Sequence, residues 1–244
     1  MIEKTFIYGD SFSNHEHING LEALDRNSMW YAPLSVGDTV DRTKMGKSPP
    51  TMFLQATHDA MTQKTPVRMI VALGACARLT EYTDEWHAEE KLKDVDPSTP
   101  LPEPARKTTL NDCEPYLDRV EITEHNMSQF HPTLLWANIY KGIADLNLLC
   151  GSRGHQLLVL HMNTTPDNTW INKSHPLIAP LCRHAEALDN YLTEQESCCH
   201  LCQTNGIKPL DYDTYGWQGH HGIEGQSYFG SHVHKRVEAL ELWN

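Results

Sequence analysis

The run VRMIVALGA at residues 67–75 constrains the fold more than any other part of the sequence. It is apolar at almost every position, contains three β-branched residues, and is bounded by Pro66 and Gly74. A strand with one solvated face alternates polar and apolar residues, whereas a continuous apolar run is typical of a strand that is buried on both faces. Such strands belong to parallel sheets that helices cover on both sides. We therefore predict an α/β fold.

The rest of the chain alternates between strand-type and helix-type apolar patterns, which is typical of strands joined by crossover helices. The order predicts a three-layer α/β/α sandwich around a mostly parallel, doubly wound, flavodoxin-like sheet. Ligands of such folds bind beyond the carboxyl ends of the strands. Further strands are predicted at 5–8, 38–40 and 156–163, and helices within 20–36 and at 49–63, 134–154, 179–206 and 230–243.

The length of 244 residues suits one continuous α/β core, so we expect a single domain over residues 1–244. One segment departs from the alternating pattern. Residues from about 80 to 132 are charged and rich in proline, and include the stretch DVDPSTPLPEPARK. Proline disfavours both helix interiors and central strands, so this segment is predicted to be an insertion over the active face.

Composition excludes several classes of partner. Twenty Lys and Arg against 32 Asp and Glu give a net charge of −12, which repels phosphate backbones and anionic lipid surfaces, so we expect neither nucleic acid nor membrane as a partner. No signal peptide or run of about 18 apolar residues is visible, which predicts a cytoplasmic protein. The odd count of seven cysteines also fits a reducing compartment better than a disulfide framework.

Two segments at opposite ends of the chain carry chemically useful residues. In FIYGDSFSN (residues 6–14), a short apolar strand runs directly into Gly9-Asp10-Ser11. These residues suit an ordinary tight turn, or a turn that holds a serine nucleophile at a strand end. In DYDTYGWQGHHGIEGQSYFG (residues 211–230), His220 and His221 lie in a glycine-rich and aromatic loop before the last predicted helix. A histidine there can activate the serine.

Together these segments resemble the SGNH (GDSL-type) serine hydrolases, and in particular the divergent members that tailed bacteriophages encode. The resemblance implies an SGNH hydrolase-like fold in which Ser11 is the nucleophile and its backbone N–H forms part of the oxyanion hole. It implies His221 as the base, because a glycine and an aromatic residue follow it at offsets of four and eight, and His220 lacks these offsets. Gly46, within KMGKSPP, would be a second oxyanion donor, and Asp10, Gly74 and His220 are expected beside the oxyanion or the substrate.

Two positions depart from the family pattern. Cys76 stands where the family has an asparagine that completes the oxyanion hole, and a cysteine is a poor hydrogen-bond donor. Gln218 stands where the family has the acidic residue, three positions before His221. Either Asp213 or Asp211 therefore supplies the acid, or the site works as a Ser–His dyad.

The resulting hypothesis is a serine esterase that acts through an acyl-enzyme, with no cofactor, on a small-molecule or carbohydrate ester such as an O-acetylated sugar. An alternative is a catalytically degenerate SGNH domain that serves as a binding module or a structural part of a phage virion. A third is a metal-dependent hydrolase that uses some of the 15 histidines. The oligomeric state stays open.

Two short motifs invite a metal hypothesis. CCHLC (residues 198–202) offers three thiols and a histidine, but structural zinc usually takes two ligand pairs from separate segments. On a helix, Cys198 and Cys202 share a face and Cys199 points elsewhere. We therefore expect core packing and no metal there. His232 and His234 diverge on the last predicted helix and are expected at the surface.

Overall fold

The computed structural model describes most of the chain outside the proline-rich segment. Within this part, no helix is both long and apolar enough to cross a bilayer. The predicted insertion at about 80–132 lies almost entirely outside the described residues. The described ranges are 2–10, 12–14, 24–43, 49–74, 132–164 (side chains from 136 onward) and 173–243.

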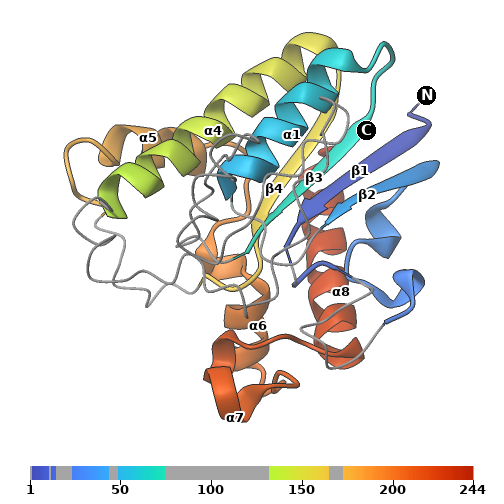
Figure 1. Cartoon of the computed structure of the whole chain (residues 1–244), viewed down its shortest axis with the longest axis vertical. Helices are drawn as coiled ribbons and strands as arrows, with labels where there is room; N and C mark the ends of the chain where they lie inside the picture. The colour runs from blue at the N-terminus through green and yellow to red at the C-terminus, as the bar shows by residue number, and fades with distance from the viewer. Residues whose placement is uncertain are drawn as a thin grey trace, which may run out of the picture.

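The centre of the described structure is a four-stranded sheet with the strand order β2-β1-β3-β4, in which every neighbouring pair is parallel (Figure 1). The run that predicted an α/β fold forms β3, which is buried at all six positions between β1 and β4. The predicted parallel sheet is confirmed. The strands are β1 (Lys4–Gly9), β2 (Asp38–Thr43), β3 (Arg68–Leu73) and β4 (Gln156–His161).

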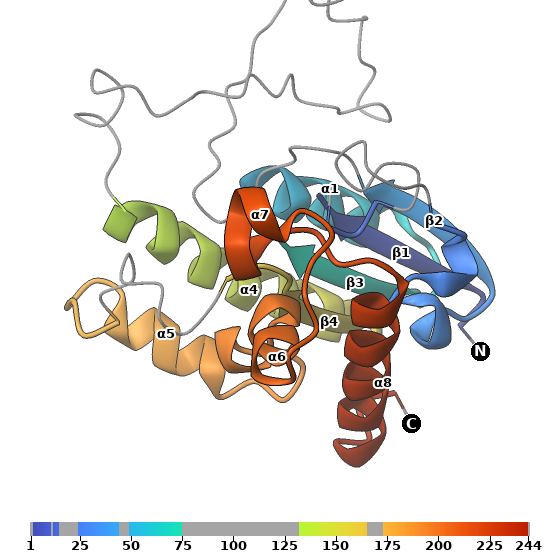
Figure 2. The same ribbon diagram turned by 90° about the horizontal axis from the view of Figure 1, so that it is seen from below.

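Alternate residues of the strands pack into two separate apolar layers, one on each face of the sheet. Phe6 and Tyr8 lie in one layer, and Ile7 lies in the other. Helices cover both layers, which confirms the three-layer sandwich (Figures 1 and 2). The first layer is covered by α1 (Pro49–Thr62), α4 (Pro132–Arg153) and α5 (Ala179–Glu186). The second is covered by α6 (Cys198–Thr204), α8 (Ile223–Ala239) and the 3-10 turn η2 (Ala32–Leu34).

The single helix predicted at 179–206 is wrong. The chain leaves the helix after α5 because its backbone pairs with the edge strand β4. Val159 donates a hydrogen bond from its N–H to the carbonyl of Asn190, and Leu192 donates one to the carbonyl of Val159, each at 2.9 Å. The helical apolar pattern is satisfied by two short helices, α5 and α6, with the 3-10 turn η4 (Glu194–Glu196) between them.

The boundaries of two other predicted helices also differ. In the described part of residues 20–36, Pro33 lies within a 3-10 turn and there is no α-helix. The last helix, α8, begins at Ile223, seven residues before the predicted start, so much of the glycine-rich loop is helical. The segment before α8 holds two further short elements, α7 (Tyr212–Tyr215) and η5 (Gly216–Gln218).

Candidate active site

The turn after β1 is held by Asp10. The backbone N–H of Phe12 donates to Oδ1 of Asp10 at 3.1 Å, and the N–H of Ser13 donates to the carbonyl of Asp10 at 3.0 Å. Asp10 is fully buried. Ser11 lies outside the described residues, but the residues on both sides of it are fixed by these two hydrogen bonds. Asp10 therefore holds Phe12 and Ser13 at the end of β1.

Gly74 ends β3 in contact with the same carboxylate. A Cβ placed on Gly74 would lie 1.8 Å from Oδ2 of Asp10, which no side chain could tolerate. The missing side chain thus lets Asp10 pack against the end of the neighbouring strand. Asp10 and Gly74 were both expected near the substrate. The structure brings them together at the carboxyl ends of β1 and β3 in a packing role, and their contact with substrate stays a prediction.

His220 and Asp211 form a buried pair in the segment before α8. Nδ1 of His220 lies 2.7 Å from Oδ2 of Asp211, and the backbone N–H of His220 donates to Oδ1 of the same carboxylate at 2.6 Å. Leu210 donates a further backbone hydrogen bond to the carbonyl of His220 at 2.7 Å. The pair favours the tautomer with the proton on Nδ1, which leaves the lone pair on Nε2 for proton transfer.

Gly219 makes this pairing sterically possible. A Cβ on Gly219 would lie 2.0 Å from Oδ1 of Asp211. The backbone of Gly219 has φ −77°, which any residue can adopt, so the glycine is required by the close approach of the carboxylate and not by its conformation.

The ring of His220 stacks on Phe12, the residue that directly follows Ser11. The two ring centroids are 4.2 Å apart and the ring planes differ by 11°. Residues that are more than 200 positions apart in the sequence are thus in contact at one end of the sheet. The His220–Asp211 pair lies beside the turn that carries the expected nucleophile.

Gln226, on the first turn of α8, ties these two segments together. Its Nε2 donates to the carbonyls of Phe12 and His221, at 3.3 and 3.2 Å, and its Oε1 accepts from the backbone N–H of Trp30 at 3.4 Å. The side chain is 1 % exposed. Because an amide has both donors and an acceptor, one residue can hold all three backbone segments.

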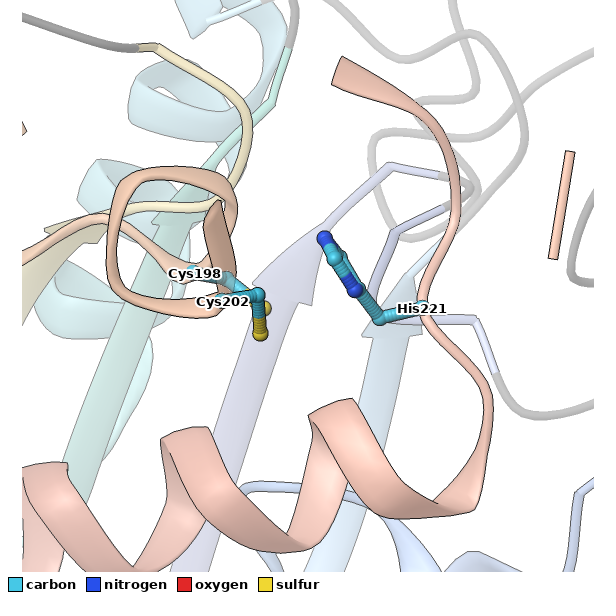
Figure 3. Close-up of side chains that lie close together, drawn as sticks. All are labelled: Cys198, Cys202 and His221. Carbon is cyan, nitrogen blue, oxygen red and sulfur yellow. The ribbon is translucent and has the colours of Figure 1, made fainter. Parts of the chain in front are cut away.

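His221, which we expected to be the base, lies elsewhere. Its ring is buried next to Cys198 and Cys202 of α6 (Figure 3). His221 packs so closely on α8 that a Cβ placed on Gly225 would lie 2.6 Å from the Cβ of His221. The glycine at the offset of four therefore makes room for the ring of His221 and gives no information about a base. Of the two histidines, His220 and not His221 has a carboxylate partner.

The same contrast holds for the candidate acids. Asp213 is exposed on α7 and Gln218 is exposed in η5, while Asp211 contacts the histidine. Of the two carboxylates that the sequence left open, Asp211 is the one in position. Gly46 and Cys76, like Ser11, lie outside the described residues, so the expected oxyanion donors stay predictions.

Several solved structures resemble this chain. Protein YxiM from Bacillus subtilis matches with a TM-score of 0.51 and 12% identity, over 100% of this chain and 58% of that protein. The chain has the fold of YxiM. TesA (TM-score 0.48, 12% identity, 98% of this chain and 99% of that one) and a putative lipolytic protein of the G-D-S-L family from Desulfitobacterium hafniense (0.47, 11%, 96% and 98%) are also similar. No protein-family model and no curated protein matches the sequence.

A second buried polar cluster lies at the end of β4, on the side of α4 and α5. Nε2 of His161 lies 2.7 Å from the hydroxyl of Tyr191, and Glu194 accepts a hydrogen bond from Lys173 at 3.0 Å. Burial lowers the pKa of His161 to about 4, although the charge of Glu194 opposes the shift. His161 is therefore neutral at ordinary pH and belongs to the core of the protein.

Neither the role of Gln226 nor the pairing of His220 with Asp211 was predicted from the sequence, which favoured His221 as the base. One signal for His220 was present in the sequence: Gly219 directly precedes it, and an aspartate stands at the start of the same loop. No local pattern predicts Gln226, because its three partners lie in three different segments.

Proposed function

We propose that the chain is a serine acyl hydrolase that cleaves small esters, with Ser11 as nucleophile, His220 as general base and acid, and Asp211 as the orienting carboxylate. The observation that carries this proposal is the His220–Asp211 pair at 2.7 Å, whose imidazole stacks on the residue next to Ser11. The sequence resemblance to the SGNH hydrolases supplies the role of the serine. The departure at Gln218 no longer counts against activity, because Asp211 stands in the acid's place.

In the proposed mechanism, Nε2 of His220 removes the proton from the hydroxyl of Ser11 as its oxygen attacks the ester carbonyl carbon. Asp211 accepts a hydrogen bond from Nδ1 and stabilises the imidazolium that forms. Backbone N–H groups of Ser11 and Gly46 would stabilise the oxyanion. His220 then gives the proton to the leaving alcohol, and water releases the acyl group by the same steps in reverse.

Aromatic side chains around His220 support a carbohydrate ester as the substrate. Tyr215 lies edge-on to the ring of His220, with centroids 6.5 Å apart, and 53 % of its surface is exposed. Tyr212 and Trp217 pack edge to face next to it, at 5.0 Å. Aromatic faces with a polar tip suit sugars better than long acyl chains, because they combine apolar area with hydrogen bonding.

A fluorophosphonate probe tests the nucleophile. We expect covalent labelling of folded wild-type protein at Ser11, none in Ser11→Ala, and turnover of a small acetyl ester above that control. Matched spectra of the two proteins by circular dichroism would establish that both are folded. Absence of both labelling and turnover in folded wild-type protein would reject the enzyme and favour the non-catalytic binding or virion module.

Acyl and alcohol preference test the substrate class. We expect faster cleavage of acetyl than of octanoyl esters of the same alcohol, and release of acetate from an acetylated polysaccharide. Replacing Tyr215 by Ala should raise KM for the polysaccharide more than for a small acetyl ester. A preference for the octanoyl ester would contradict the carbohydrate assignment while leaving the catalytic residues in place.

A further inference from the structure

Two cysteines of α6 and His221 form a compact cluster between α6 and α8 (Figure 3). Cys198 and Cys202 are one helical turn apart and share a face, as expected from the sequence. His221 faces them from the segment that precedes α8. The two Sγ atoms and one ring nitrogen all lie within 4.8 Å of one another, and none of the three residues is more than 2 % exposed.

The imidazole of His221 is buried with both ring nitrogens lacking a hydrogen-bond partner among the described residues. This is unusual, because a buried polar group without a partner is costly and most native polar groups avoid it. The neighbouring His220, by contrast, has its carboxylate. A ligand between His221 and the two thiols would satisfy the orphaned nitrogen that faces them.

The third cysteine of the motif does not belong to the cluster. Sγ of Cys199 points toward the carbonyl of Gly219, at 3.8 Å, and burial raises its pKa. A thiolate is the form in which cysteine binds metals.

We propose that Cys198, Cys202 and His221 bind one Zn²⁺ ion through two thiolates and one imidazole nitrogen. Soft sulfur with imidazole nitrogen is the donor set that zinc prefers in proteins. Tetrahedral bonds of about 2.3 Å to sulfur and 2.0 Å to nitrogen put the ligand atoms about 3.5–3.8 Å apart, so small side-chain rotations close the site. Binding releases the two thiol protons, and a water molecule takes the fourth position.

From the sequence, no zinc site was expected at CCHLC, because this motif offers no second pair of ligands. The fold supplies the third ligand from a residue 19 positions further along the chain. No other described His, Cys, Asp or Glu joins the cluster, so the donor set is two sulfurs and one nitrogen. The ion would fasten the segment with His220 to α6 and so help to hold the proposed base in place. This effect on catalysis rests on the proposed function, whereas the metal site itself does not.

Cobalt titration of reduced, metal-free protein tests the site directly. Co²⁺ bound to thiolates gives strong charge-transfer absorption, and Zn²⁺ should displace it in proportion to the number of sites. We expect one ion per chain with a zinc dissociation constant below about 1 µM. Elemental analysis of protein purified without chelators should give the same stoichiometry.

Variants separate the three ligands from their neighbours. Cys198→Ser, Cys202→Ser and His221→Gln should each weaken binding by more than the roughly 10–100-fold that loss of an outer partner costs. Cys199→Ser is the matched control, because it removes a buried thiol from the same helix and should leave the charge-transfer band and the stoichiometry unchanged. If the serine variants do not fold, His221→Gln and the wild-type titration still decide the question.

Two outcomes would overturn the proposal: zinc binding weaker than about 1 µM by the wild-type protein, or equal binding by wild type and His221→Gln. The cobalt titration should give the same result in Ser11→Ala, so the test of the metal site does not depend on hydrolase activity. Folded wild-type protein that binds cobalt but cleaves no ester would reject only the proposed function, and wild-type protein that cleaves esters but binds no cobalt would reject only the metal site.

Discussion

His220 and His221 are neighbours in the sequence and differ in almost every physical respect. His220 has a carboxylate at 2.7 Å and an aromatic ring stacked on it, beside the end of β1. His221 has two thiols near it and no hydrogen-bond partner for its ring among the described residues. Side chains at consecutive positions of an extended segment point to opposite sides. One position therefore faces the sheet edge and the other faces the space between α6 and α8.

Sequence offsets that suggest a base histidine can also arise from packing. The offsets to Gly225 and Phe229 favoured His221, and both residues do matter to the fold: Gly225 makes room for the ring of His221, and Phe229 lies on the fully buried face of α8. Those offsets describe packing. The base is defined by an acid partner and by proximity to the nucleophile, which depend on the loop's path.

The largest expected effect comes from His220. His220→Ala should lower kcat for a small acetyl ester by on the order of 10⁴ or more, because the nucleophile loses its base. His221→Gln should lower kcat by no more than about tenfold, through a looser loop, while it weakens cobalt binding by more than about 100-fold. Steady-state kinetics and the cobalt titration on both variants measure this.

An activity loss in His221→Gln as large as that in His220→Ala, with fold retained, would reverse the assignment. His232→Gln serves as a control for removing a histidine, since it lies on the outer part of α8 next to Glu196. Its activity should stay within about twofold of wild type.

The next largest effect on kcat distinguishes the two candidate acids, Asp211 and Asp213. Asp211→Asn should lower kcat by on the order of 10³–10⁴, since an amide neither fixes the tautomer of His220 nor stabilises the imidazolium. Asp213→Asn, two residues away and exposed, should change kcat by less than about twofold. Equal, small effects of the two substitutions would favour a Ser–His dyad.

Two glycines offer a steric test of the contrast between His220 and His221. Gly219→Ala forces a Cβ to within 2.0 Å of Oδ1 of Asp211, so it should displace the acid and lower kcat by about 10²-fold, with cobalt binding retained. Gly225→Ala forces a Cβ to within 2.6 Å of Cβ of His221, so it should weaken cobalt binding and have the smaller effect on kcat.

The two glycine variants must give this crossed pattern for the comparison to hold. If both lowered activity and metal binding in equal proportion, the loop would behave as one unit and the two histidines would not have separate roles. Thermal melting of each variant identifies a general loss of folding.

The sheet and its layers could be predicted from the sequence, because the apolar run of β3 and the alternating pattern are local features that the core requires. The break in the helix predicted at 179–206 could not, because it depends on pairing between Asn190 and the edge strand β4, which is distant in sequence. The site divides in the same way. The turn with Asp10 is local, whereas the pairing of Asp211 with His220 requires the path of a loop.

The smallest expected effect concerns a third buried histidine, His161, and stability instead of activity. Its pKa is about 4 in the folded protein and 6.5 ordinarily. The unfolded chain therefore takes up a proton below pH 6.5 that the folded protein refuses, so stability is full above this pH and declines as the pH falls toward 4. The loss should reach about 2.5 kcal/mol between pH 8 and pH 4.5. Glu194, whose pKa is lowered in the folded state by the charge and hydrogen bond of Lys173 despite its burial, loses its own contribution only below its ordinary value of 4.5. His161→Gln keeps a polar group for Tyr191 and cannot titrate, so urea unfolding at pH 8, 6 and 4.5 should show a flatter pH dependence in the variant. Parallel curves for the two proteins would mean that the pKa of His161 is the same in the folded and unfolded states, and the contrast between buried and reactive histidines would then fail at this position.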